Sequence, residues 1–341
     1  MKRFTGFVYI LIAVLLLAGC RDEQFAPDPN VPDESMRLTI YTSHKQGVYE
    51  PVIREFEERT GIWVSVETGG TNELLERIAG ESDAPVCDVM FGGGVENLES
   101  SRKYFAPYRS PECENISPAF ASRDNIWTPF SSLPIVLIYN TKLVSPGELT
   151  GWNDLLEDEW RGKIAFADPS VSGSSYTALC TLCQIIGGEH SPALERFAGQ
   201  LAGRQLSDSG QVISAVANGS FLAGVTLEET ALKSIAAGDD VAMLYPVEGT
   251  SAVPDGGALI LGAPHEENAK LFLDFILGKD VQSRVVRQFS RRSVREDAVS
   301  SETLVSNAEL RLIDYDIAWA SGEHGRILGR WAAASGAEVA K

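Results

Sequence analysis

The sequence predicts an α/β fold made of two lobes, each a mostly parallel sheet flanked by helices. Near the start of the chain, strand-like apolar runs alternate with amphipathic helical runs, which is the pattern of parallel strands joined by right-handed crossovers. The 341 residues exceed what one ordinary hydrophobic core holds, so a second lobe is expected. The apolar run at residues 133–139 then offers a strand that crosses from the first lobe into the second.

The first lobe opens with three strands and two helices in alternation. Strands are expected at residues 38–41, 62–66 and 88–91. Over residues 48–59 apolar side chains recur every fourth position and so share one helical face, and a second helix is expected around residues 73–78. Ligands of such sheets bind beyond the carboxyl ends of the strands. Here those ends are small and polar, and the residues that could meet a ligand are Thr42, Ser43, His44, Gly93 and Gly94.

The later elements follow from the same kind of pattern. Residues 210–245 predict helix, strand, helix and strand, with Asn218-Gly219 as a turn. The chain is expected to return to the first lobe with a strand at residues 253–262 and an amphipathic helix at residues 266–277. The expected segments are a leader (1–19), a lipidated cysteine and tether (20–36), a first lobe (37–132 with about 250–290), a second lobe (133–249) and C-terminal helices packed on the lobes (291–341).

The N-terminus has the layout of a secretory signal. Two basic residues precede an apolar run, residues 7–17, that is too short to span a bilayer comfortably. The run ends in Leu-Ala-Gly-Cys, which resembles a bacterial lipobox and implies cleavage before Cys20 and a lipid on its sulfur; an ordinary signal peptide with an incidental cysteine is the alternative. Residues 21–35 are polar and proline-rich, as in an extended tether. We therefore expect an extracytoplasmic protein, lipid-anchored to a bacterial membrane in the periplasm or on the cell surface.

The chain is strongly acidic, with a formal net charge of −18. Such a surface argues against nucleic acid as a partner. An anionic small molecule remains acceptable, because exposed charges beyond a Debye length of about 8 Å are largely screened. Local dipoles at the binding site should therefore decide the affinity of the protein for an anionic small molecule.

The most informative stretch is Ser172-Gly173-Ser174-Ser175. It lies between a strand-like run at residues 162–168 and a helical run at residues 176–186. A small-residue loop that opens a helix presents unpaired N–H groups, hydroxyl donors and the positive end of the helix dipole together. This combination predicts a cradle for a phosphate or a carboxylate. Simple capping of the helix by serine is the alternative.

Four cysteines follow Cys20, and an extracytoplasmic setting permits disulfides among Cys87, Cys113, Cys180 and Cys183. The last two are three positions apart on one helical face and could form a redox pair or half of a zinc site. Two apolar core thiols or a local disulfide fit better, because no second cysteine or histidine pair stands nearby. No metal or cofactor is expected.

Several motifs, in the right order, resemble the type 2 periplasmic solute-binding proteins of ABC transporters. They are Leu-Thr-Ile-Tyr-Thr-Ser-His (38–44), Phe-Glu-Glu-Arg-Thr-Gly-Ile (56–62), Gly-Trp-Asn-Asp-Leu-Leu (151–156), Trp-Arg-Gly-Lys-Ile (160–164) and Tyr-Pro-Val-Glu-Gly-Thr (245–250). Each motif alone is weak, but their order is specific. More narrowly, they look like the branch of ferric-ion, hexose-phosphate and phosphonate binders, over about residues 37–298.

This resemblance implies a two-lobed clamp with its substrate site in the cleft between the lobes. It also implies a membrane permease that receives the solute. A binding protein without catalytic activity, monomeric in solution, is therefore expected.

The residues after one strand bear on the choice of solute. Ferric-ion binders of this branch usually carry paired tyrosines just after the strand that here reads Ala-Gly-Val-Thr-Leu (223–227). In this chain Glu228, Glu229 and Thr230 follow, so the phenolate pair is missing. Adjacent helical positions point about 100° apart, so neighbouring glutamates do not aim at one metal ion. Fe(III) stays an alternative that this difference weakens.

The serines favour a phosphorylated solute, with a sugar phosphate as the leading candidate, because a phosphate dianion needs many donors. His44 could add a donor or simply close the strand end. Carboxylates could accept hydrogen bonds from sugar hydroxyls or an ammonium, or be solvated surface acids; Glu228 stands out because it directly follows a strand. The expected substrate-binding set is Thr42, Ser43, His44, Gly93, Gly94, Ser132, Ser172, Gly173, Ser174, Ser175, Asp208, Glu228 and Glu248.

Two features stay open at this stage. The basic cluster of Arg291, Arg292 and Arg295 could bind an anion, or pair with the acidic surface or the domain interface.

After the phosphorylated solute and Fe(III), a secreted hydrolase using a carboxylate pair and His44 is a third, weaker hypothesis for the function. The chain has no Gly-x-Ser-x-Gly, no His-Glu-x-x-His and only four histidines.

Overall fold

The structure is a computed structural model that describes residues 32–186, 191–299, 304–306 and 309–336. The expected leader, Cys20 and most of the tether fall in residues 1–31, outside the described residues. From Ser35 onward the chain belongs to one compact unit. Within the described ranges, no helix is both long and apolar enough to cross a membrane.

The first region of the sheet contains the strands that were expected near the start of the chain. Its spatial order is β2 (Trp63–Thr68), β1 (Arg37–Thr42), β3 (Val89–Gly94), β9 (Ala252–Ile260) and β5 (Thr128–Asn140). Two short strands complete it, β4 (Phe105–Ala106) beside β9 and β10 (Arg292–Ser293) beside β5. β1 pairs in parallel with β2 and β3, as the alternating pattern predicts.

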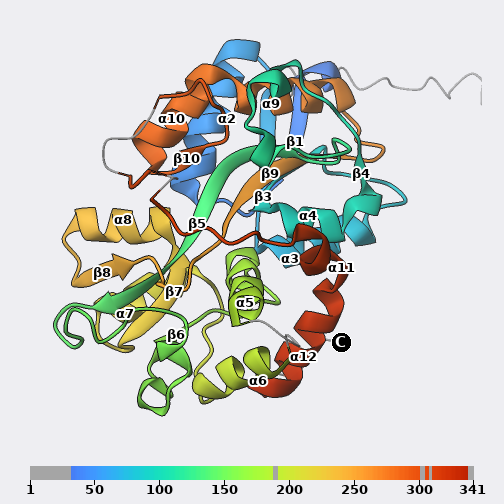
Figure 1. Cartoon of the computed structure of the whole chain (residues 1–341). Helices are drawn as coiled ribbons and strands as arrows, with labels where there is room; N and C mark the ends of the chain where they lie inside the picture. Colours follow the sequence, from blue (N-terminus) through green and yellow to red (C-terminus); the bar gives the residue numbers. More distant parts are fainter. Residues whose placement is uncertain (1–31, 187–190, 300–303, 307–308, 337–341) are drawn as a thin grey trace, which may run out of the picture. The chain divides into compact units, whose positions relative to one another are not determined.

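β5 links this region to a second one (Figure 1). Its first half pairs with β9, and its second half pairs with β7 (Ala223–Leu227) and β8 (Val241–Leu244), while β6 (Ile164–Ala165) lies beside β7. The pairs that β5 and β9 make are antiparallel, so the sheet is mixed. The reason is topological, since β5 carries the chain from the first region to the second and β9 returns it in the opposite direction.

Helices cover both faces of the first region. α2 (Gln46–Thr60), α9 (Glu266–Leu277) and α10 (Lys279–Phe289) pack on one face, and α3 (Thr71–Gly80) and α4 (Val95–Ser100) pack on the other. Side chains alternate along the strands accordingly. In β3, Val89 and Phe91 enter the first of these cores and Met90 enters the second.

The second region is covered in the same way. α5 (Gly173–Ile186), α6 (Ser191–Gln200) and α12 (His324–Ser335) pack on one face, and α7 (Gly210–Ala217) and α8 (Glu228–Ala237) on the other. Ile135 and Leu137 of β5 face the first group, whereas Val136 and Ile138 face the second. α11 (Ile317–Gly322) lies against α4, and the Tyr176 hydroxyl of α5 donates to the Ala320 carbonyl at 2.5 Å. Short 3₁₀ helices occur at Glu34–Met36, Arg102–Tyr104, Pro111–Asn115, Pro118–Phe120, Asp154–Leu156 and Asp158–Trp160.

The cysteines and the surface charge bear on the alternatives left open by the sequence. Cys87, Cys113, Cys180 and Cys183 are free thiols, and burial raises the pKa of Cys183 to about 12. The buried thiols of Cys87, Cys180 and Cys183 behave as core groups and not as reactive ones, whereas Cys113 is half-buried. Among the described residues, no cluster of three or more histidine, cysteine, aspartate or glutamate side chains could hold a metal ion.

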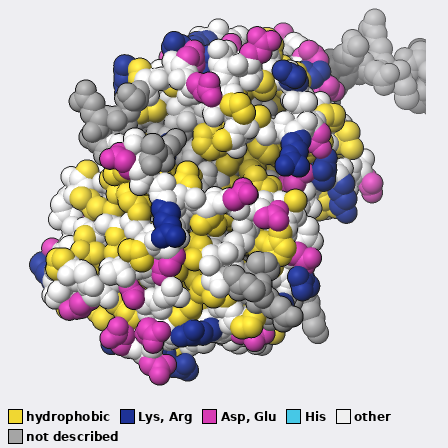
Figure 2. All heavy atoms as spheres, in the orientation of Figure 1, with side chains coloured by type: hydrophobic (Ala, Val, Ile, Leu, Met, Phe, Trp, Pro, Cys, Tyr) yellow, Lys and Arg dark blue, Asp and Glu magenta, His cyan; other side chains and the backbone are white. Residues whose placement is uncertain are grey.

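Figure 2 shows Lys and Arg side chains in small groups among Asp and Glu, without a continuous basic surface on that face.

Candidate functional site

A cavity of about 890 Å³ opens where the ends of β1 and β3 meet the first turns of five helices, α2, α3, α5, α7 and α8. Both sheet regions contribute to its wall. The N-terminal turn of a helix carries unpaired N–H groups and a partial positive charge, so this arrangement favours an anion. The expected binding residues that line the cavity are Ser43, His44, Gly93, Gly94, Ser172, Gly173, Ser174 and Asp208.

The N-termini of α3 and α5 converge at this wall. A Cβ atom added to Gly70 would lie 2.6 Å from the Val171 carbonyl oxygen, and one added to Gly173 would lie 2.7 Å from Thr71 Oγ1. The Asn72 amide also donates to the Pro169 carbonyl at 3.0 Å. Only glycine permits this approach without a shift of the backbone or of Thr71. The sequence did not predict that the two helix ends meet, because they come from different sheet regions.

The serine loop both caps α5 and faces the cavity. Ser172 Oγ accepts a hydrogen bond from the Ser175 N–H at 3.2 Å, which is the usual N-cap contact, and it lies 3.1 Å from Ser174 Oγ. Ser175 itself is buried and does not line the cavity. In the described part of the chain, the N–H groups of Gly173 and Ser174 have no hydrogen-bond acceptor. Capping and an anion cradle are thus compatible at this loop.

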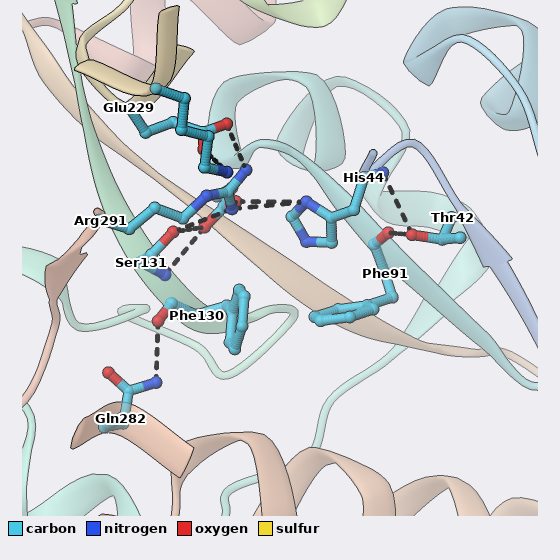
Figure 3. A network of polar contacts seen from close by, with 10 residues as sticks. Thr42, His44, Phe91, Phe130, Ser131, Glu229, Gln282 and Arg291 are labelled. Carbon is cyan, nitrogen blue, oxygen red and sulfur yellow. Dashed lines mark hydrogen bonds and ion pairs between the residues drawn. The ribbon is translucent and has the colours of Figure 1, made fainter. Parts of the chain in front are cut away.

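Arg291 lines the cavity at what we call its floor, and Figure 3 shows it within a network of polar contacts. It donates to Asp255 at 2.7 Å and to Ser131 Oγ at 3.2 Å, and it reaches Glu229 at the start of α8 at 3.1 Å. Lys233 also binds Glu229, at 2.6 Å. Burial alone would raise the pKa of Glu229, but Arg291 and Lys233 outweigh it and lower that pKa. Glu229 is therefore compensated within the protein, whereas at Asp255 burial outweighs Arg291 and raises the pKa of the carboxyl.

His44 is buried beside this network. Burial, together with Arg291 and Lys233, holds the pKa of His44 well below its usual range, so the imidazole is neutral at physiological pH. Its Nδ1 lies 3.5 Å from an Arg291 nitrogen and 3.6 Å from Asp255 Oδ2. Its ring also packs edge-on against Phe91, with ring centroids 4.4 Å apart. His44 thus packs at the strand end and lines the cavity, and its role as a donor to a solute stays a prediction.

Glu228 is placed differently from the sequence expectation. It does not line the cavity; it is buried and accepts two hydrogen bonds from Arg292, both at 2.8 Å, and one from the Tyr245 hydroxyl. The next residue, Glu229, faces the cavity instead. Adjacent positions on a helix point about 100° apart, so only one of the two can face the ligand side. The strand-end position alone could not tell which one.

Four other expected residues also lie outside the cavity wall and have structural partners. The Thr42 hydroxyl donates to the Phe91 carbonyl at 2.6 Å, and the Ser132 hydroxyl donates to the Ala252 carbonyl at 3.2 Å. Glu248 accepts from the backbone N–H groups of Trp152 and Asn153, at 3.0 and 2.9 Å. Ser175, as described above, is the fourth. The contacts of Thr42, Ser132 and Glu248 connect segments far apart in sequence, which is why local patterns did not show them.

Sequence reasoning missed two lysines. Lys45 directly follows His44 and extends toward α7, because a Cβ atom added to Gly210 would lie 3.0 Å from Lys45 Nζ. Lys233 lies one helical turn after Glu229. The i,i+4 spacing of Glu229 and Lys233 was a usable signal. Asp208 lines the cavity, and its carboxylate accepts from the Gly210 N–H at 2.8 Å at the start of α7.

Comparisons with known proteins agree on one family. A family model described as bacterial extracellular solute-binding protein matches residues 86–319. The periplasmic binding protein AfuA from Actinobacillus pleuropneumoniae, solved with exogenous fructose-6-phosphate bound, is 25% identical with a TM-score of 0.82, over 89% of this chain and 99% of that one.

Two curated relatives have names that refer to iron. Iron uptake protein A1 of Synechocystis is 26% identical over 297 residues, which is 82% of this chain and 81% of that protein. The Fe(3+)-binding periplasmic protein of Serratia marcescens is 23% identical over 282 residues, 79% of this chain and 81% of that protein. The similar proteins therefore differ in the solute their names give.

Proposed function

We propose that this chain, which belongs to the family of bacterial extracellular solute-binding proteins, binds a phosphorylated organic solute in its cavity and delivers it to an ABC permease. The family match confirms the resemblance drawn from the sequence motifs, and the likeness to AfuA confirms the α/β fold of periplasmic binding proteins. A sugar phosphate is the leading candidate. The protein acts by binding and release, without turnover.

The observation that carries this proposal is the convergence of the α3 and α5 N-termini on the cavity. Gly173 and Ser174 offer N–H donors, Ser43 and Ser174 offer hydroxyls, and the helix dipoles add a positive potential. A phosphate ester at neutral pH carries a charge of roughly −1.5 to −2 and three strong acceptor oxygens. Each hydrogen bond to such a group contributes about 1.5–3 kcal/mol. A neutral solute would leave these donors underused.

The rest of the cavity has room for the body of the solute. A volume of about 890 Å³ is within the range of small-molecule sites and far exceeds a bare phosphate. Asp208, Thr230 and Lys233, from α8 and the loop before α7, also line it and can meet hydroxyl groups. In this proposal these residues, and not Glu228, determine the selectivity between solutes that differ outside the phosphate group.

Delivery requires that the protein release its solute at the membrane. We treat the two sheet regions as lobes, residues 37–132 with 250–290 and residues 133–249, that open and close about the crossing strands β5 and β9. A lipid on Cys20 would hold this monomer near its permease.

Fe(III) is the competing solute, given the names of the two curated relatives. In this chain the residues after β7 are Glu228 and Glu229, and both are already bound to buried arginines. Recruiting either to a metal would leave an arginine unpaired in the protein interior, which is costly. We therefore expect weak iron binding.

Calorimetric titration tests the proposal directly. Fructose 6-phosphate, a 2-carbon phosphonate and fructose are compared with ferric citrate, after a thermal-shift screen in which a solute at about 100 times its Kd adds roughly 2.7 kcal/mol. Tight one-to-one binding of a phosphorylated or phosphonate solute, with none for fructose, is the expected result. Equal affinity for fructose and its phosphate, or tighter binding of ferric ion, would overturn it.

A further inference from the structure

Glu96 is a buried acid beside the cavity that the proposed function does not use. It lies in the first turn of α4, and its side chain is fully buried. It shares a hydrogen bond with the Thr177 hydroxyl of α5, and the Asn97 amide donates to the same carboxyl oxygen at 3.2 Å. Its other oxygen, Oε2, has no hydrogen-bond partner in the described part of the protein. Because Gly94 and Thr177 line the cavity, Glu96 lies directly behind its wall.

No cationic side chain faces this carboxyl among the described residues. The titratable groups that act on it or are acted on by it are Tyr176 and Cys180 of α5 and Tyr315 before α11. Burial raises the pKa of all three, so they are neutral at physiological pH. The cavity cations, Lys45, Lys233 and Arg291, do not contribute at Glu96. An ionised Glu96 would thus be a buried charge without a counter-ion, which is strongly unfavourable.

The hydrogen bonds point to the same protonation state. Thr177 Oγ1 lies 3.0 Å from the Gly173 carbonyl, which can only accept, and it also contacts Glu96. A hydroxyl has one proton to donate. Both contacts are satisfied together only when Thr177 donates to Gly173 and Glu96 carries the proton that it donates to Thr177. Burial also raises the pKa of Glu96, to about 7.

We propose that Glu96 is a neutral carboxylic acid where α4 and α5 are in contact, as in this structure, and that it positions the N-terminus of α5. Solute binding, by holding the two regions together, would then take up a proton at this residue. α4 belongs to the first sheet region and α5 to the second, and their contact helps to place Gly173 and Ser174 at the cavity. Glu96 is a positioning residue in this scheme, because it reaches the solute only through α5. The coupling to solute rests on the proposed function.

The direction of the pH effect follows from linkage. A carboxyl whose pKa is higher in the folded state, with α4 and α5 in contact, than when it is exposed makes that state take up protons. The state with α4 and α5 in contact is therefore favoured at low pH, and the advantage is lost as pH rises from the exposed value, 4.5, to the folded value, about 7. Above that pH the effect levels off.

The first experiment needs no solute. The wild-type chain, Glu96→Gln and the control Glu76→Gln, which changes an exposed glutamate of α3, are unfolded with urea from pH 4.5 to 8.5. Relative to Glu96→Gln, the unfolding equilibrium constant of the wild type should rise by up to about tenfold per pH unit between pH 5 and 7 and then stay constant. Glu76→Gln should follow the wild type at every pH. A constant ratio between wild type and Glu96→Gln would overturn the neutral acid.

The second experiment measures the coupling. Calorimetry of fructose 6-phosphate in buffers of different ionisation enthalpy gives the protons taken up on binding, and the difference between wild type and Glu96→Gln cancels those of the solute. A larger uptake by the wild type near pH 6.5 supports the proposal, and equal uptake refutes it. If neither protein binds the solute, the proposed function fails, while the urea series still decides the protonation state of Glu96.

Should Glu96→Gln not fold, carboxyl ¹³C NMR of the wild type and of Thr177→Val replaces both experiments. The absence of a glutamate that titrates above pH 6 would refute the proposal.

Discussion

Two buried glutamates at the cavity, Glu229 and Glu96, differ in their electrostatic surroundings. Glu229 lies between Arg291 and Lys233, which lower its pKa despite burial. Glu96 meets hydroxyl, thiol and amide groups but no cation among the described residues, and burial raises its pKa to about 7. The difference teaches that burial sets the size of the electrostatic penalty, whereas the neighbours decide whether a carboxyl meets it by pairing or by keeping its proton.

Removal of the cation at Glu229 should have the largest effect. Arg291→Met leaves Glu229 and Asp255 buried with less compensation, so we expect a loss of about 3–5 kcal/mol in the free energy of unfolding. Urea denaturation at pH 7 measures it, and the exposed Arg287→Met of α10 is the control. The loss should shrink at low pH, where the two carboxyls can take up protons. A loss no larger than that of the control would mean that Lys233 and Ser131 alone compensate these acids.

The second-largest effect is expected for the serine loop, residues 172–175. Ser174→Ala removes a hydroxyl that lines the cavity without removing the cap, so affinity for every phosphorylated solute should fall about 10- to 150-fold with little change in stability. Ser172→Ala removes the cap and should lower stability as well, by roughly 0.5–2 kcal/mol. Calorimetry and thermal unfolding measure the two effects. The nearby Ser170→Ala, whose hydroxyl binds Asp168, is the matched control. Unchanged affinity in Ser174→Ala would reduce the loop to a simple helix cap.

The smallest effect on affinity is expected for Glu228, which is paired like Glu229 but lies outside the cavity wall. Glu228→Gln removes a charge-assisted bond to Arg292, so stability should fall by about 1–3 kcal/mol. Affinities for a panel of phosphate esters should change by less than about twofold, because no contact with the solute is lost. A selective loss for some esters, measured by calorimetry, would place Glu228 at the solute after all.

Local elements were readable from the sequence because they depend on neighbours along the chain. The helix expected at residues 266–277 is α9, Glu266–Leu277, since its apolar positions recur with helical period. The serine loop was predicted at the N-terminus of α5, where the structure has it at the cavity. The glycine-rich end of β3 was likewise expected near a ligand, and Gly93 and Gly94 line the wall.

The site was less predictable wherever two distant segments meet. Glu248 is a residue type that often binds ligands, yet its carboxylate accepts hydrogen bonds from the backbone N–H groups of Trp152 and Asn153 and so stabilises that turn. Arg291 was one of three clustered arginines with several possible partners, and only its contacts with Asp255 and Glu229 place it under the cavity. Lys45 gave no signal beyond its position after His44.

The sequence by itself determined the alternation of strands and helices, the α/β fold, the family resemblance and the serine loop that opens α5. These properties reside in short-range periodicity and in motifs of a few residues. Only the tertiary structure decided which of Glu228 and Glu229 faces the cavity, and that no cation of the described residues lies beside Glu96. The physical reason is that a side chain's direction and its charge state depend on groups brought from far along the chain, at distances of a few ångströms that no local pattern records.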